Sequence, residues 1–511
     1  MNFKKVFIGI GVLWWLILAC GTGFCEEQLD FDETEALIYI LREKGIISDV
    51  EAARFLEIYT NQVAIKKSKK DQMAKEYEEK LKAYEQKMEL QEKYVDRQFE
   101  EFKGEMLYNK VPDWVSKLKW KGDIRSRYQA DLFDKSNADF HKSDDFTELA
   151  NTKRDRYRVR LRSRIDLLAN ISKEVQAGVR LSTGNEKDPV STNDTMGDYF
   201  NKDGIVLDRA YLKWQPFSQL AVTGGRFENP WFGTDLVWDS DVNFEGLAVS
   251  AQLSPSEASS FYLTMGAFPL QEEEWHKDKW LLGYQVGKSF KPRADLKYQF
   301  AVAYYDYHNI EGVLNDVNRP NQKDYTAPLF MQKGNSLIDI DPSPDSILPA
   351  MGSDYNELNF TARIDMAFFY PVNIVLEFDF VTNVGFDEKD ILKKVKVLEG
   401  LDNNEYKGID SWPEDVNGYQ LALTVGNETT KKLAEWKTYL AYKHLEADAV
   451  LDAFTDSDFH LGGTNARGWI LGAQAGIAKN TWVAFKWISA DEILGSPLSI
   501  DVMQFDLNVS F

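Results

Sequence analysis

Residues 154–168 read RDRYRVRLRSRIDLL, and from residue 156 onward charged positions alternate with uncharged ones. In a β-strand successive side chains point to opposite faces, so this pattern predicts a strand with two unlike faces. A helix would distribute the arginines around its axis and leave no apolar stripe. One face would carry Arg156, Arg158, Arg160, Arg162, Arg164 and Asp166. The other would carry Tyr157, Val159, Leu161, Ser163, Ile165 and Leu167.

The row of arginines determines the environment that this strand needs. Same-face neighbours on a strand lie about 6.7 Å apart, and two like charges at that separation repel by about 2.5 kcal/mol at an effective dielectric of about 20. The charged face therefore needs water and opposing carboxylates, whereas the other face needs apolar surroundings. Both needs are met in the wall of a water-filled membrane barrel. The edge of a soluble β-sandwich is the alternative.

The rest of the chain favours the barrel. From residue 117 onward about sixteen segments alternate in the same way, and the last of them is 503–511. Short turns such as 170–171 and 479–480 alternate with long loops such as 133–153 and 309–355. Short turns on one side and long loops on the other are the outer-membrane pattern, which a soluble sandwich would not keep. We therefore expect an all-β fold, a closed antiparallel transmembrane β-barrel of about sixteen strands.

The composition excludes several classes of protein. The chain has 511 residues and a formal net charge of −21, which argues against a nucleic-acid partner. Its mean hydropathy of −0.41 is too low for a bundle of membrane-spanning helices. Aromatic residues make up 13% of the chain, with 23 Tyr and 14 Trp, which fits the aromatic girdles of a membrane barrel.

The N-terminus predicts an export signal over residues 1–25. Lys4 and Lys5 precede an apolar run that is too short for a comfortable membrane span. Cleavage after Cys25 would leave a mature chain without cysteine, so neither a disulfide nor a thiol site is expected. Lipoprotein-type cleavage, which would leave Cys20 acylated, is the alternative.

Two helical segments are expected before the barrel, on the periplasmic side of an outer membrane. Residues 26–64 predict two short helices, with a stop at Gly45 and Ser48 as the cap of the second. Residues 65–112 predict a coiled-coil helix, because apolar residues recur near heptad positions among many Glu and Lys. A single solvated helix is the alternative for that segment. The barrel would then occupy residues 113–511.

Several stretches carry a resemblance to a known family. The chain ends in FDLNVSF, residues 505–511, which resembles the C-terminal assembly signal of bacterial outer-membrane barrels. VTGGRFENPW at 222–231, TDLVWD at 234–239 and FEG at 244–246, together with LDRAYL at 207–212, resemble the putative-porin family of Gram-negative bacteria. The resemblance implies a signal peptide, a helical N-terminal segment and an outer-membrane porin barrel.

A barrel of about sixteen strands is too wide for its side chains to fill, so it predicts an aqueous channel for passive diffusion of small hydrophilic solutes or ions. Lumen charge and any loop folded inward would set its selectivity. The candidate constriction is the loop 228–243, by analogy with general porins, with the acidic residues Glu228, Asp235, Asp239 and Asp241. The candidate pore-lining residues, which would favour anions, are Arg125, Arg127, Arg156, Arg158, Arg160, Arg162, Arg164, Arg180, Arg209 and Arg226.

The acidic loop has two interpretations. Facing a basic wall, it would produce a transverse electric field across the pore that sorts solutes by charge. Alternatively, the acids only neutralise the arginines through ion pairs and have no role in selectivity. A calcium loop at Asp239 and Asp241 is disfavoured, because an EF-hand needs a glycine at its sixth place and a ligand where Ser250 stands. A different calcium site in the acidic loops stays an alternative.

Catalysis finds little support in the sequence. Asp306 and His308 would share one strand face, and so would Asp458 and His460, but no nucleophile motif accompanies either pair. We interpret these histidines as surface polar residues and expect neither an enzyme nor a cofactor.

The expected partners are outer-membrane lipid, small hydrophilic solutes or ions, and further copies of the chain in a homotrimer. The alternative function is a structural outer-membrane anchor, whose helical segment tethers the envelope to peptidoglycan.

Overall fold

The computed structural model describes residues 115–142, 148–341, 343, 347–400 and 406–511, together with scattered residues between 40 and 97. The chain divides into two units, Met1–Val111 and Pro112–Phe511. The predicted signal peptide and the pairing of the predicted coiled coil lie outside the described residues.

In the first unit, Ser48 caps a helix as the sequence predicts. The Glu51 N–H donates to Ser48 Oγ at 3.3 Å, and the Ser48 N–H donates to the Glu51 carboxylate at 2.9 Å. This reciprocal arrangement is a capping box, which satisfies two N–H groups that the first helical turn leaves without partners.

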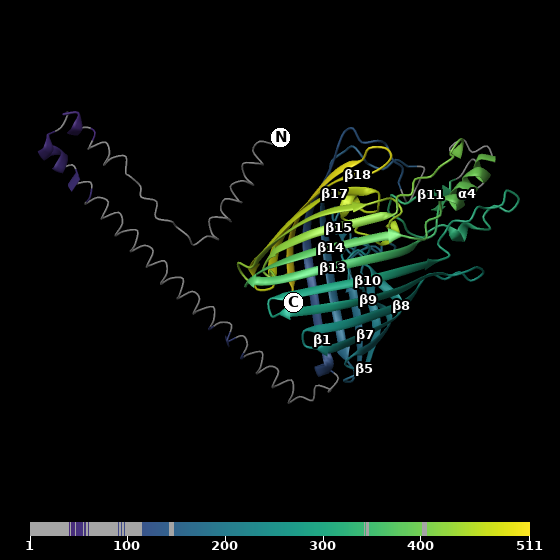
Figure 1. The fold of residues 1–511 in the computed structure, drawn as a ribbon, viewed down its shortest axis with the longest axis horizontal. Helices are drawn as coiled ribbons and strands as arrows, with labels where there is room; N and C mark the ends of the chain where they lie inside the picture. The colour runs from purple at the N-terminus through teal and green to yellow at the C-terminus, as the bar shows by residue number, and fades with distance from the viewer. Residues whose placement is uncertain are drawn as a thin grey trace. The chain divides into compact units, whose positions relative to one another are not determined.

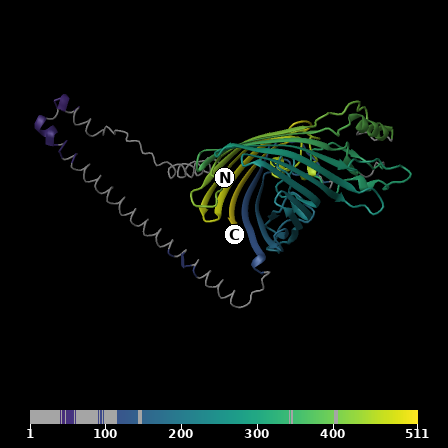
Figure 2. The ribbon, with the colours of Figure 1, turned by 60° about the horizontal axis from the view of Figure 1, so that its bottom comes forward.

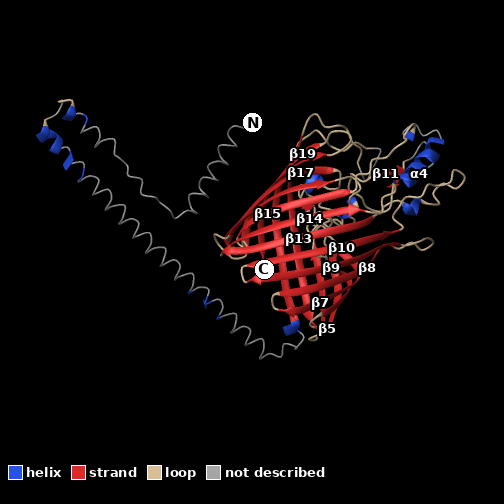
Figure 3. Cartoon of the chain, viewed as in Figure 1, coloured by secondary structure: helices blue, strands red, loops and turns tan. Residues whose placement is uncertain are grey.

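In the second unit, long antiparallel strands form one sheet that closes on itself (Figure 1). The described residues contribute sixteen such strands, which confirms the fold expected from the sequence (Figure 3). They are β1 (Leu118–Phe133), β2 (Arg156–Asn170), β3 (Val175–Ser182), β5 (Val206–Phe217), β6 (Leu220–Glu228), β7 (Asn243–Ser256), β8 (Ser259–Gln271), β9 (Lys279–Arg293), β10 (Leu296–His308), β13 (Asn356–Phe369), β14 (Val372–Asn383), β15 (Asn417–Gly426), β16 (Trp436–Leu445), β17 (Ala466–Ala478), β18 (Thr481–Glu492) and β19 (Ser499–Ser510).

The two faces of the wall differ in the way that the alternating sequence predicts. On β1 the apolar Trp120 and Tyr128 are 65% and 45% exposed, whereas Arg127 and Gln129 between and beside them are buried. Tyr157 on β2 is exposed in the same way. The apolar side chains therefore point outward and the charged ones inward, and an outward apolar surface of this kind suits hydrocarbon rather than water.

The first and last strands close the barrel. β1 pairs antiparallel with β19 from Asp123 opposite Ser510 to Phe133 opposite Ile500. The terminal Phe511 extends this pairing, because it exchanges two backbone hydrogen bonds of 3.0 Å with Gly122. Closure leaves no free sheet edge. A free edge would expose unpaired backbone N–H and C=O groups, which a lipid environment does not tolerate. Figure 2 shows the strands curving around the barrel.

Short turns join the strands at one end, as in 171–174 and 479–480, and most connections at the other end are long. The long connections hold the short elements β4 (Asp194–Thr195), η2 (Asp324–Thr326), β11 (Leu337–Asp339), β12 (Pro349–Met351), α4 (Glu388–Gly400), η4 (Asp452–Phe454) and η5 (Phe459–Leu461), while η1 (Val115–Lys117) precedes β1. The alternation of lengths has exceptions, since 272–278 and 493–498 on the long-loop side are brief.

Helix α4 was not expected within the long connection that contains it. Asp387 caps it by accepting the Lys389 N–H at 2.9 Å, and Ile391, Val395 and Leu398 form one buried apolar face. This face packs against the β11–β12 hairpin in a small core beyond the strand ends (Figure 1). None of the described helices is long and apolar enough to cross a membrane.

We predict that Gly122→Ala weakens barrel closure. A Cβ at this position would lie 2.4 Å from the Phe511 ring and 2.8 Å from the Arg164 carbonyl oxygen, and overpacking of this kind costs about 1–3 kcal/mol. The temperature at which the folded band disappears on a detergent gel should fall. Gly224→Ala is the control, because its Cβ would meet nothing closer than Leu247 at 3.6 Å. Equal midpoints for the two variants would contradict this account of closure.

Candidate functional site

Seven arginines on β1 and β2 lie on the inward face, and together they are called the arginine wall. The strand register places Arg125 opposite Arg162 and Arg127 opposite Arg160. The members of the arginine wall are Arg125, Arg127, Arg156, Arg158, Arg160, Arg162 and Arg164. Five side chains in alternate positions of one strand and two of its neighbour thus form a continuous cationic surface.

Carboxylates on β1, on β19 and on nearby loops neutralise part of the arginine wall. Asp131 accepts Arg158 at 2.7 Å, and Asp123 accepts Arg162 at 2.8 Å. Four of the seven arginines form ion pairs, which are Arg158–Asp131, Arg162–Asp123, Arg164–Asp123, Arg164–Asp241, Arg127–Asp506 and Arg127–Asp458. Of these carboxylates only Asp241 belongs to the predicted constriction loop.

The next two predicted arginines also face inward. Arg180 on β3 pairs with Asp166 of β2 at 2.8 Å, and Arg209 on β5 pairs with Glu228 at 2.7 Å. A register shift between β3 and β5 leaves Asp208 as an extra residue. Its buried carboxylate accepts Asn243 Nδ2 at 2.7 Å and lies 3.7 Å from Arg180. Simple alternation would have turned Asp208 outward, so the sequence did not identify it.

Arg226 reaches the group around Asp208, on which Arg180 and Arg209 also act, from a different face of its strand. Its neighbour Phe227 occupies the inward position and is buried against Phe268. Arg226 takes the alternate position, where it pairs with Glu245 of β7 at 2.6 Å and donates to the Asp208 carbonyl. The reason is the register, since Phe227 and Phe244 form the inward pair next to it.

Residues 229–242, called the first inserted loop, enter the interior of the barrel. Within it, the Phe232 N–H donates to Gln285 of β9 at 2.9 Å, and Thr234 Oγ1 donates to Asp379 of β14 at 2.7 Å. Asp235 pairs with Lys443 of β16 at 3.2 Å. Strands so far apart around the wall can be contacted together only from inside. Glu228 and Asn243 themselves belong to β6 and β7 rather than to the loop.

Aromatic packing holds this loop in place. Trp238 lies edge-on to Tyr305, with ring centroids 5.1 Å apart. Trp231 also lies edge-on to Tyr305, and the distance between these two ring centroids is 5.4 Å. Leu236 and Val237 are buried beside them. The interior next to β7–β10 is therefore an apolar core, not the water that the barrel's width alone predicts. The signals lay in the sequence, in the bulky apolar residues of the loop and the inward tyrosines of β10.

A second inserted loop, residues 446–465, crosses from the first one to the arginine wall. Thr455 Oγ1 donates to the Leu236 carbonyl at 2.8 Å, and the Asp239 N–H donates to the Phe454 carbonyl at 2.7 Å. Farther along, Asp458 accepts Arg127 of the wall at 3.2 Å. Asp458 and His460 were expected to share a strand face, which is wrong, because both lie in this loop.

Buried charges join the loops to the wall. Lys443 is fully buried and pairs with Asp235 of the first inserted loop at 3.2 Å and with Asp456 of the second at 3.0 Å. Burial would raise the pKa of Asp458, but Arg127 and Lys486 outweigh it and hold that pKa well below its usual range. Asp458 is therefore a fixed structural anion within the barrel.

Asp239 behaves differently from the other acids of the first inserted loop. It accepts the N–H groups of Asp241 and Ser457 at 2.8 Å each, and none of the described cations forms an ion pair with it. Burial, followed by nearby Asp456 and Asp241, raises its pKa well above the ordinary value and favours the protonated form. Among the described residues no group of three or more His, Cys, Asp or Glu could hold a metal ion.

The histidines occupy unlike surroundings. His308 pairs with Asp306 at 3.2 Å at the exposed end of β10, as the shared strand face predicts. His460 was expected at the surface but is fully buried, with Nε2 3.0 Å from the Leu498 carbonyl and Lys333 Nζ 3.2 Å from Nδ1. Burial and then Lys333 lower the pKa of His460 well below its usual range, so the ring is neutral.

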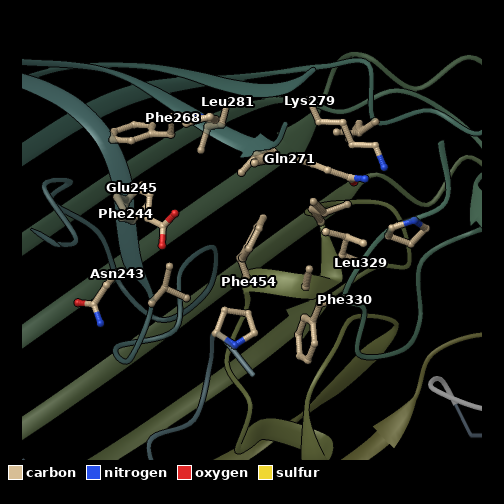
Figure 4. Close-up of a pocket in the computed structure, with 18 of the residues that line it drawn as sticks. Asn243, Phe244, Glu245, Phe268, Gln271, Lys279, Leu281, Leu329, Phe330 and Phe454 are labelled. Carbon is tan, nitrogen blue, oxygen red and sulfur yellow. The ribbon is translucent and has the colours of Figure 1, made fainter. Parts of the chain in front are cut away.

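Two cavities lie along the strands of the barrel, and the first of them is also lined by both inserted loops. One, of about 300 Å³, lies among Phe244, Phe268, Leu281 and Phe454, with Lys279 among the residues lining it (Figure 4). The other, of about 510 Å³, lies by the short turns after β9 and β15. Its lining is largely polar and includes Lys297, Gln299, Arg363, Asp365, Glu377, Thr424 and Lys437.

Comparisons with known proteins add the following findings. Residues 32–511 match a family model described as "Putative porin". No curated protein matches the sequence. Among solved structures, the chain is similar to the outer membrane channel DcaP of Acinetobacter baumannii (TM-score 0.40, 9% identity, 77% of this chain and 97% of that chain covered). It is also similar to OprB of Pseudomonas putida at high pH (TM-score 0.45, 12% identity, 78% of this chain and 96% of that chain covered). A third similar structure is an anion-selective porin from Comamonas acidovorans (TM-score 0.41, 10% identity, 77% of this chain and 99% of that chain covered).

We predict that Lys443→Met frees both inserted loops. The variant would leave Asp235 and Asp456 buried without their shared cation, and breaking a buried pair in this way costs about 3–5 kcal/mol. Limited proteolysis of the folded protein should then cut within 229–242 and 446–465. Lys213→Met, which removes a half-buried lysine on the inward face of β5, should leave both loops resistant. Resistance in both variants would show that Lys443 does not hold the loops.

We predict a pH dependence that arises from Asp452 in the second inserted loop. Burial raises the pKa of Asp452 to about 7, and Asp448 adds to the shift. The folded protein therefore holds a proton that the unfolded chain loses above about pH 4. The contribution of this group to stability is complete below that pH, falls as the pH rises to about 7, and stays constant above it.

The measurement is hydrogen exchange of 446–465 in lipid, corrected for the intrinsic effect of pH. Protection should decline across this window, and Asp452→Asn should make the decline shallower. A variant with the same slope as the native chain would exclude Asp452 as its source.

Proposed function

Because the chain belongs to the putative porin family, we propose that it is an outer-membrane channel for passive diffusion of small hydrophilic solutes or ions. The observation that carries the proposal is the closed wall itself, apolar outside and charged inside. Inward charges such as Arg162 and Asp123 serve no purpose in a dry core, whereas they suit a water-filled path. The family and the fold both favour a channel over an enzyme.

The path runs along the arginine wall. The apolar core around Trp238 and Tyr305 closes the side of β7–β10 to polar solutes. The opposite side is lined by charged side chains, of which Arg162 and Arg164 are partly exposed. The first inserted loop lies between the two sides and forms the constriction. Solutes therefore pass along the wall of β1, β2 and β3, beside the points where Asp241 and Asp458 of the inserted loops contact it.

The channel favours anions. The pore-lining arginines are the arginine wall with Arg180 and Arg209, while Arg226 is left out because of its position. Of the loop acids, Asp235 and Asp241 are paired with cations, and Asp239 favours its protonated form. Most loop acids thus act as neutralising partners, which leaves little transverse field. Selectivity follows instead from the surplus of arginines over carboxylates.

We also expect that the chain forms a homotrimer and that its N-terminal segment lies in the periplasm. The alternative role, in which the segment 65–112 tethers the envelope to peptidoglycan, also stays a prediction, and pull-down of the full chain with peptidoglycan tests it.

In planar bilayers we expect ion conductance with a reversal potential that indicates anion preference in a KCl gradient. Arg158→Ala/Arg160→Ala should reduce the chloride-to-potassium permeability ratio by about twofold or more, because two lumen cations are lost. Lys288→Ala/Arg467→Ala removes two cations from the outward face and should leave the ratio unchanged. An absence of conductance would refute the channel, and an unchanged ratio in the first variant would refute the anion preference.

A further inference from the structure

Arg125 and Arg160 differ from the other buried members of the arginine wall, among which Arg156 is not counted because it is exposed. Arg125 Nη2 donates to the amide oxygen of Asn193, and Arg160 Nη2 donates to Ser191 Oγ at 3.3 Å. Arg160 Nη1 also reaches Gln129 at 3.4 Å. All of these partners are neutral. Among the described residues neither arginine forms an ion pair, although both are largely buried.

The two arginines converge on one point. Ser191 and Asn193 lie in the connection 183–205, and the backbone N–H and the side-chain amide of Asn193 both donate to Ser191 Oγ, at 3.3 and 3.2 Å. The short strand β4 follows directly and pairs Thr195 with Arg160, which anchors this part of the connection on β2. The two guanidinium groups therefore contact neighbouring neutral side chains, Asn193 and Ser191, which are hydrogen-bonded to each other.

Both arginines keep an N–H donor that has no acceptor. The Nε atoms of Arg125 and Arg160 are buried and have no hydrogen-bond partner. A buried N–H of a charged group without an acceptor is costly, and the cost is removed when an anion binds. The neighbouring positions hold further cations, since Arg162 lies opposite Arg125 and Arg127 lies opposite Arg160.

Nearby carboxylates are engaged elsewhere. Asp458 and Asp506 act on Arg125 from a distance but are bound to Arg127. Asp131 acts on Arg160 but is bound to Arg158. Asp188 also lies near Arg160, and its carboxylate accepts the Val190 N–H at 3.0 Å. Within the described part of the chain, neither arginine therefore has a carboxylate within ion-pair distance, and Asp188 acts on Arg160 only from farther away.

We propose that Arg125 and Arg160, with Ser191 and Asn193, form a binding site for a doubly charged oxyanion on the solute path. Guanidinium groups present planar forks that match the oxygens of phosphate, sulfate and carboxylate groups. Two such forks suit a solute that carries two negative charges on oxygen, such as a phosphate or a dicarboxylate, better than a single chloride. The inference rests on the proposed channel function and names the class of solute that the channel selects.

The test is single-channel recording in planar bilayers in KCl at constant ionic strength. Inorganic phosphate, sulfate and succinate are added in separate titrations, with acetate as the singly charged control. In the native channel each dianion should reduce the chloride current in a saturable way, and acetate should not. In Arg125→Gln/Arg160→Gln the half-blocking phosphate concentration should rise by about tenfold or more, as expected when charge-assisted hydrogen bonds are lost.

Lys213→Gln/Lys297→Gln is the matched control. It also removes two half-buried cations from the inward face, on β5 and β10, away from Ser191 and Asn193. Phosphate block in this variant should equal that of the native channel. Equal weakening in both double variants would mean a general effect of lumen charge and would overturn the site. Block by only one of the dianions would narrow the class to that group and uphold the site.

Different outcomes refute the oxyanion site and the channel. A channel that conducts chloride but shows no saturable block by any dianion refutes the site alone. A folded protein that conducts no ions refutes the channel. Folding of each variant is checked by the migration of the folded band on a detergent gel.

Discussion

The outer face of β1 and β2 is apolar, so the arginines of these two strands are all accommodated on the inside. There, repulsion between same-face neighbours is relieved by carboxylates from three sources. Asp123 and Asp131 come from the adjacent strand, Asp506 from the closing strand, and Asp241 and Asp458 from the inserted loops. Charge balance inside the wall therefore decides where the loops bind, and the loops in turn decide how much of the interior remains for water.

The two inserted loops connect the apolar and the charged halves of the interior. One end of this connection is the aromatic packing of Trp231 and Trp238, and the other is the contact of Asp458 with Arg127. Between them, Lys443 binds an aspartate from each loop. Buried pairs of this kind contribute little net stability but penalise every arrangement that separates them. The loops thus have one favoured position, which is what a channel with a defined constriction requires.

Local patterns in the sequence were sufficient to predict the strands of the barrel wall, but not the loops that fill part of its interior. Alternation identifies a strand such as β2 because a period of two depends only on neighbouring residues. The path of the loop 229–242 depends on contacts with Gln285, Asp379 and Lys443, which no local pattern connects. Asp208 escaped detection because a single extra residue in β5 reverses the expected face. His460 was assigned to the surface because its burial depends on Lys333, in a connection distant in sequence.

The central claim is that β2 separates lipid on one side from water on the other, and thiol labelling in vesicles tests it most directly. In a chain with Cys20 and Cys25 replaced by Ser, single cysteines would be placed in turn at Val159, Arg160, Leu161 and Arg162, and a charged, membrane-impermeant thiol reagent would be added. We predict rapid labelling at 160 and 162 and none at 159 and 161. Labelling at all four positions at the same rate would contradict the two-faced wall and, with it, the channel.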